Sequence, residues 1–193
     1  NNTLVPSGGK GISIASGGVG NDTVRNNTIA SPSLTITPLG IASSTTTTNR
    51  FIDNVLVINT TGSAVTALST GTTSQIENNS VKHYRGTGMT ILGASNVTGN
   101  IVNITTGVNS ETGIGTTGGA GINVTKNIIE INSSTSFTIL AIGTSTNAID
   151  NNITILTGGG GSGLSITTGT GRHTGNIINI TGNTSGASFV RGI

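Results

Sequence analysis

One arrangement of apolar and polar positions recurs along the chain: an apolar residue, two variable residues, an Asn and then an apolar pair. Copies begin at residues 24, 76, 97, 124, 149 and 173, and a further copy at residues 52–55 carries its Asn one position early. Asn2 marks a partial first copy. Short apolar phrases of this kind predict strands rather than helices. The repeated asparagines are Asn27, Asn54, Asn79, Asn100, Asn127, Asn152 and Asn176.

Successive asparagines of this set lie 21 to 27 residues apart. A second apolar phrase, often opened by Gly, falls between the Asn phrases, as at Gly11, Gly88 and Gly163. Turns rich in Gly, Ser and Thr separate the phrases. The sequence therefore predicts two or three strands in each repeat, with loops of variable length and strands kept in register.

These repeats predict an all-β fold, a parallel β-helix (solenoid) of about eight coils that forms a single domain over residues 1–193. Stacked coils lie about 4.8 Å apart, so equivalent residues stand over one another. Stacked Asn side chains can then form a hydrogen-bonded ladder, and Asn also tolerates the left-handed backbone of a sharp corner. A disordered low-complexity tract is the competing interpretation, but composition alone would not maintain a periodic apolar phrase.

The repeated phrase resembles that of right-handed parallel β-helix proteins, the pectin-lyase-like superfamily. The resemblance extends from Asn2 to about Phe189 and concerns the fold only. It implies right-handed winding, three sheets and extracellular work at polysaccharide surfaces. The superfamily includes polysaccharide lyases and hydrolases, phage tailspikes and adhesin passenger domains, and fold membership does not choose among them.

The composition narrows the function classes. Only 7% of the residues are charged and 2% are aromatic, so a nucleic-acid interface, which needs clustered cations or stacking rings, is not expected. The chain has no Cys, which excludes disulfides and thiolate metal sites. No apolar run approaches the roughly 20 residues of a membrane span. Gly113 opens a GxGxxG pattern without a following helix, so we expect no dinucleotide cofactor. His83 and His173 are far apart in the repeat and form no ligand pair, so we expect no bound metal.

Enzymes of the resembled superfamily carry clustered acidic residues, often beside Arg or Lys. Aligned on the apolar residue before each Asn, the copies place Arg25, Asp53 and Glu77 in one column on successive coils. Two carboxylates within about 5 Å could act as an acid–base pair, which makes Asp53 and Glu77 the weak catalytic candidates. The alternative, which we favour, is a solvated column in which Arg25 neutralises Asp53.

The densest polar cluster is Lys82-His83-Tyr84-Arg85. With Arg25, it supplies the candidate ligand-binding residues, because its cations could hold an anionic sugar or a phosphate. Its alternative role is a loop or outward strand face that keeps a weakly charged solenoid soluble. His173 occupies a position that is apolar in other copies, which favours a packed side chain over a metal ligand.

We therefore expect a structural or adhesive module of a secreted or cell-surface protein, and we favour this role over an enzyme without excluding enzyme activity. Asn1 begins within a repeat and the last residues read as an uncapped strand, so we expect a piece of a longer chain or a subunit that self-associates through its coil ends into fibres or a sheath. The alternative is a domain that binds or degrades polysaccharide, with cell-surface glycans as partners. Ice binding ranks last, because the Thr runs do not repeat at the coil period.

Overall fold

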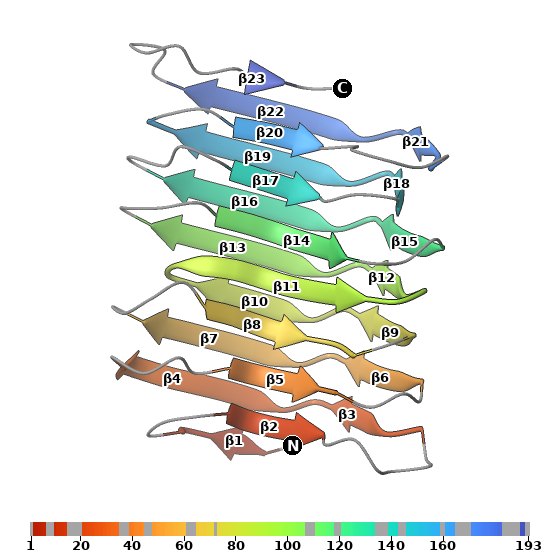
Figure 1. Cartoon of the computed structure of the whole chain (residues 1–193). Coiled ribbons are helices and arrows are strands. Elements are labelled where there is room, and N and C mark those ends of the chain that lie inside the picture. The colour runs from red at the N-terminus through yellow and green to blue at the C-terminus, as the bar shows by residue number, and fades with distance from the viewer. Residues whose placement is uncertain are drawn as a thin grey trace.

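The computed structural model describes residues 2–6, 10–14, 21–34, 39–44, 48–60, 65–71, 73–106, 111–117, 121–133, 139–142, 146–158, 161–164, 171–182 and 190–191. The described residues form strands and turns and no helix. Every strand pairing is parallel, and the strands stack along one axis in three sheets, as Figure 1 shows. The predicted all-β parallel solenoid is thus confirmed, with three strands to a coil.

Sheet A has eight strands, which follow one another in chain order at every third element. They are β1 (Thr3–Leu4), β4 (Thr28–Leu34), β7 (Val55–Thr60), β10 (Ser80–His83), β13 (Ile101–Thr106), β16 (Ile128–Ser133), β19 (Asn152–Thr157) and β22 (Ile177–Gly182).

Sheets B and C complete each coil. Sheet B has eight strands: β2 (Lys10–Ile14), β5 (Leu39–Ser43), β8 (Val65–Ser69), β11 (Gly86–Leu92), β14 (Glu111–Thr117), β17 (Ile139–Ile142), β20 (Gly161–Leu164) and β23 (Val190–Arg191). Sheet C has seven: β3 (Thr23–Arg25), β6 (Asn49–Ile52), β9 (Ser74–Glu77), β12 (Asn96–Thr98), β15 (Ile122–Thr125), β18 (Thr146–Ile149) and β21 (His173–Thr174).

The core is a set of apolar columns that run the length of the stack. In sheet A the second position of each strand points inward, so Ile29, Leu56, Val81, Val102, Ile129 and Ile153 lie in register and are buried. Sheet C contributes a column that includes Phe51, Ile76, Val97 and Val124. β-Branched side chains suit these positions because they pack well on a pleated surface.

A column of small residues, in which Ala67 lies between Gly40 and Gly88, allows sheet B to approach sheet A closely. A Cβ atom added to Gly88 would lie 2.5 Å from Cγ1 of Val102 and 2.8 Å from the carbonyl oxygen of Gly113. Gly40 is equally confined by Leu56 and the backbone of Ala67. The Gly that opens the second apolar phrase is therefore a packing requirement.

The corner between sheets C and A holds the asparagine ladder. Each ladder Asn donates its backbone N–H and its side-chain Nδ2–H to Oδ1 of the Asn one coil further along the chain. For Asn54 both bonds to Asn79 measure 3.0 Å, and for Asn100 the bonds to Asn127 measure 2.9 and 3.0 Å. The second Nδ2 hydrogen reaches a backbone carbonyl of the preceding coil, as from Asn100 to Ile76 at 2.9 Å. The members are Asn27, Asn54, Asn79, Asn100, Asn127, Asn151 and Asn176.

The ladder member between Asn127 and Asn176 differs from the sequence-based assignment. Asn151 is buried and bonded to both neighbours, whereas Asn152 begins β19 and is exposed. The inward apolar residue of this coil is Ala148, which pairs with Val124 and His173. The sequence alignment used Ile149 instead and so shifted the copy by one residue.

The residue before each ladder Asn takes a left-handed conformation. Asn26, Asp53, Asn78, Lys126 and Asp150 have φ between 54° and 55°, and Gly99 and Gly175 have φ of 65° and 67°. Asn, Asp and Gly adopt this region most readily. Other residues are disfavoured there, because their Cβ atom crowds the backbone and their side chain forms no local hydrogen bond in compensation. Lys126 is therefore the strained member of the column.

Asn151→Ala is expected to lower the free energy of unfolding by about 2–4 kcal/mol, because it leaves the buried N–H groups of Asn127 without an acceptor. The matched control Asn152→Ala changes an exposed neighbour and should shift stability by less than about 0.5 kcal/mol. Urea unfolding followed by far-UV circular dichroism measures both. Equal losses would contradict the ladder assignment.

Lys126→Gly is expected to raise the free energy of unfolding by about 0.5–1 kcal/mol, because Gly relieves the left-handed strain at an exposed site. Thr125→Gly, one residue earlier in β15, is the control and should be destabilising. The same urea assay compares the two variants. Destabilisation by Lys126→Gly would show that the corner is not strained.

Candidate functional site

The register of sheet C separates the two candidate catalytic carboxylates. Ile52, not Asp53, pairs with Glu77 on one side and with Arg25 on the other. Phe51 is the inward residue of this coil, so Asp53 falls one position later, at the left-handed corner. The predicted column of Arg25, Asp53 and Glu77 is wrong, because the alignment took Ile52 for the anchor.

The Arg25 guanidinium contacts the Asp53 carboxylate across this corner. Arg25 Nε lies 3.4 Å from Asp53 Oδ2, and the two side chains are 60% and 35% exposed. A pair this open to solvent contributes little to stability. A hollow of about 330 Å³ beside Asp53 is lined by Asn2, Asn26, Asn27 and neighbouring residues, and Glu77 is not among them. This geometry corresponds to the neutralised, solvated alternative and brings no second carboxylate to Asp53.

The Lys82–Arg85 segment forms the tightest turn between sheets A and B in the described part of the chain. Only Tyr84 and Arg85 separate β10 from β11. A hollow of about 380 Å³ opens at this corner, lined by Val57, Ile58, Asn59, Lys82, His83, Tyr84 and Thr105. Lys82 and Tyr84 are exposed, with Tyr84 43% accessible, so an ammonium group and an aromatic ring border one concavity.

His83 differs from its exposed neighbours because it points into the core. It is 1% exposed and stands in register with Ile58 and Ile104. Its Nδ1 lies 3.2 Å from the carbonyl oxygen of Ile58, which can only accept, so Nδ1 carries the proton of that bond. His83 therefore anchors the corner from inside, and Lys82 and Tyr84 are the exposed residues of the cluster that border the hollow.

Glu111 is a buried acid that the sequence did not single out. It is 1% exposed, and its Oε2 accepts a short hydrogen bond from the backbone N–H of Gly86, directly after Arg85. The carboxylate thus holds the first residue of β11, on the strand that follows the turn. A signal existed in the sequence, since Glu111 interrupts a weakly charged stretch, but only the register places it beside Gly86.

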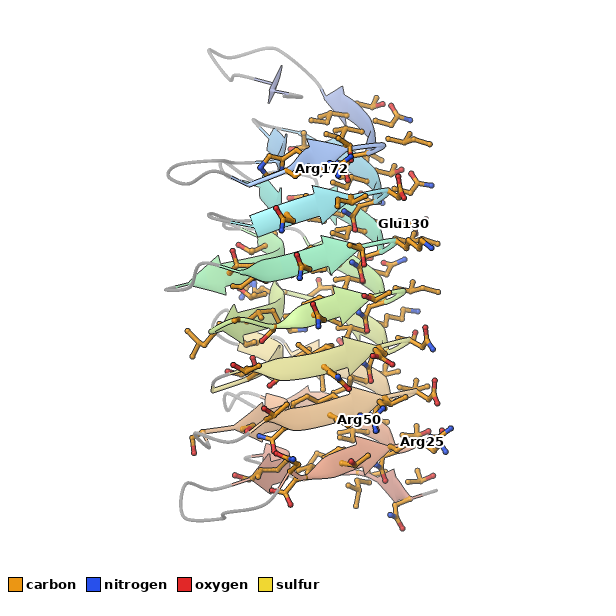
Figure 2. The ribbon with its side chains drawn as sticks, turned by 90° about the vertical axis from the view of Figure 1, so that its right-hand side faces the viewer. Arg25, Arg50, Glu130 and Arg172 are labelled. Atoms are coloured by element: carbon orange, nitrogen blue, oxygen red, sulfur yellow. The ribbon has the colours of Figure 1, made fainter. Side chains whose placement is uncertain are left out.

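Sheet C presents a second asparagine rank on its outer face, also missed from sequence. Asn123 Nδ2 donates to Asn96 Oδ1 at 2.9 Å, and Asn147 Nδ2 donates to Asn123 Oδ1 at 2.8 Å. Arg50 and Arg172 stand in the same outward column toward either end, and Figure 2 shows both on the face turned to the viewer. The rank is polar and regularly spaced. Its asparagines hydrogen-bond to one another, and Asn147 Oδ1 also accepts from the backbone N–H of Arg172.

The described residues hold no group of three or more His, Asp or Glu that could bind a metal ion. They also include no helix of a length and hydrophobicity suited to crossing a membrane. His173 continues the inward column after Ala148 and is partly buried. Comparison with protein-family models, curated proteins and solved structures gave no match.

Asp53→Asn is expected to change the free energy of unfolding by less than about 0.5 kcal/mol. The lost pair with Arg25 is exposed, and Asn suits the left-handed corner at least as well as Asp. Asp53→Ala should be worse by about 1 kcal/mol, because Ala has no polar group to support that backbone. Thermal or urea unfolding of the two variants provides the comparison. A large loss in Asp53→Asn would reveal a structural ion pair.

Proposed function

We propose that this chain is a structural or adhesive β-solenoid module, part of a secreted or cell-surface protein. The observation that carries the proposal is the uninterrupted interior. The same ladder and the same apolar columns continue from coil to coil, and they order the chain along one axis. A stack of this kind is stiff and presents long, regular outer faces.

The distribution of polar groups supports the same proposal. Arg25 and Asp53 neutralise each other, Glu77 lies one position away from the column of Asp53, and His83 is turned inward. Acid–base catalysis needs groups that converge on one reacting bond. This arrangement of polar groups favours a surface that binds other molecules over a catalytic cleft. The proposal also includes right-handed winding of the pectin-lyase-like type.

Incubation with a panel of neutral and acidic polysaccharides tests the proposal against a lyase or hydrolase. We expect no new reducing ends and no unsaturated products, from the natural chain and from Asp53→Asn and Glu77→Gln alike. Product formation that disappears in either variant, with unchanged circular dichroism, would overturn the structural assignment and make that carboxylate catalytic.

A second candidate function is glycan binding at the Tyr84 corner. An exposed aromatic ring, an ammonium group and the Asn59 side chain border the hollow of about 380 Å³. Sugar rings stack on aromatic faces while amide and ammonium groups bond their hydroxyls or carboxylates. Lys82 favours an acidic sugar.

Tyr84→Ala is expected to weaken binding to acidic oligosaccharides about tenfold or more, because it removes the stacking surface. Lys82→Ala should weaken acidic ligands more than neutral ones. Thr154→Ala, on the outward face of β19, is the control and should bind as the natural chain does. NMR titration or glycan-array binding provides the measurement. Equal binding by all four proteins would remove this corner as a glycan site.

A further inference from the structure

The outward face of sheet A carries a column beside the asparagine corner in which large apolar residues are interspersed with the polar Ser80 and Asn152. The first residues of its strands stand in register, and the large apolar members are solvent-accessible: Ile101 is 46% exposed and Ile177 65%. Val55 and Ile128 belong to the same column. Leu156, 48% exposed, lies on this face nearer the far end of its strand. Clustered aliphatic exposure of this kind marks an interaction surface.

The charged residues described on this face lie on the strands to either side of β13. Among its described outward residues, Lys82 and Glu130 are the two charged ones, and they share a column with Asn103 between them. Asn103 donates to Glu130 at 3.1 Å and so fixes the carboxylate on the surface. Figure 2 shows Glu130 projecting from the side of the stack, away from Arg50 and Arg172.

The arrangement of charges on this face is complementary to that of a second copy rotated by 180°. Rotation by 180° about a line along β13 turns the face onto itself and exchanges the strand before β13 with the strand after it. Lys82 then faces Glu130 of the partner subunit, and the reverse contact forms by symmetry. Ile101 and Asn103 lie on the axis and face their own counterparts. Such pairing needs no second kind of molecule.

The area is sufficient for a stable dimer. Seven strands, β4 to β22, are centred on β13 and spaced about 4.8 Å apart, and the six residues of β13 span about 20 Å along the strand direction. The footprint is therefore about 670 Å² on each copy, within the roughly 600–1,000 Å² per partner of specific interfaces. The Arg25–Asp53 pair lies at the corner outside this footprint.

We propose that sheet A is a lateral dimer interface, on which a second copy of this chain packs antiparallel across a twofold axis along β13. Ile101 meets its own counterpart at the apolar centre of the interface, and the two Lys82–Glu130 contacts set the register. The contact is side to side, unlike stacking through coil ends. It covers the Tyr84 corner, so an acidic glycan bound there competes with the partner.

Charge exchange tests the register. Sedimentation velocity over a concentration series should show a dimer for the natural chain. K82E should raise the dimer dissociation constant about tenfold or more, because it creates two like-charge contacts. K82E/E130K should restore the natural value. R172E, on sheet C, is the control and should dimerise normally. A chain that stays monomeric throughout, or a dimer indifferent to K82E, would overturn the proposal.

Crosslinking tests the orientation, because the chain has no natural Cys. N103C lies on the proposed axis, so a short bis-maleimide should join two copies efficiently. T154C lies two strands from the axis, which places the two thiols about 19 Å apart, and it should remain uncrosslinked. Both variants must retain the circular dichroism of the natural chain. Crosslinking of T154C in preference to N103C would exclude this axis.

Discussion

The structure depends on the full hydrogen bonding of its interior asparagines. An amide buried in an apolar stack is costly unless each of its donors and acceptors is used. Asn100 meets this condition: its Oδ1 receives two bonds from Asn79, and its N–H and Nδ2–H groups reach Asn127 and Ile76. Because each Asn supplies hydrogen-bond partners to the Asn on either side, the ladder fixes the register of the coils at one corner. The alignment of the apolar columns follows from that register.

The left-handed corner and the ladder form one unit. The chain can enter sheet A only if the residue before each ladder Asn turns sharply, and Asn, Asp and Gly make that turn most readily. This explains why acidic residues appear at Asp53 and Asp150. At both positions the Asp side chain supports the left-handed turn of the backbone.

The fold was predictable because each coil requires a hydrogen-bonded Asn at the same position of the repeat. The errors in aligning the coils arose where two adjacent residues suited the same position of the repeat. Asn151 and Asn152 are adjacent amides, and Ala148 is a weaker apolar signal than Ile149, so the sequence placed the anchor one residue late. Phe51 and Ile52 produced the same shift at Asp53. The burial of His83 and Glu111 was beyond the sequence, since only packing between neighbouring coils determines it.

The ladder also has a direction. From Asn27 to Asn151, each ladder Asn donates one side-chain N–H to the Asn of the coil that follows, and from Asn54 to Asn176 each Oδ1 accepts from the Asn of the coil that precedes. The amide dipoles therefore add along the axis, with the positive end toward β22 and the negative end toward β1, and each bond polarises the next. The molecule is thus an electrically oriented rod. For any two such dipoles side by side, opposite directions cancel the fields and equal directions reinforce them, so an antiparallel arrangement is favoured electrostatically.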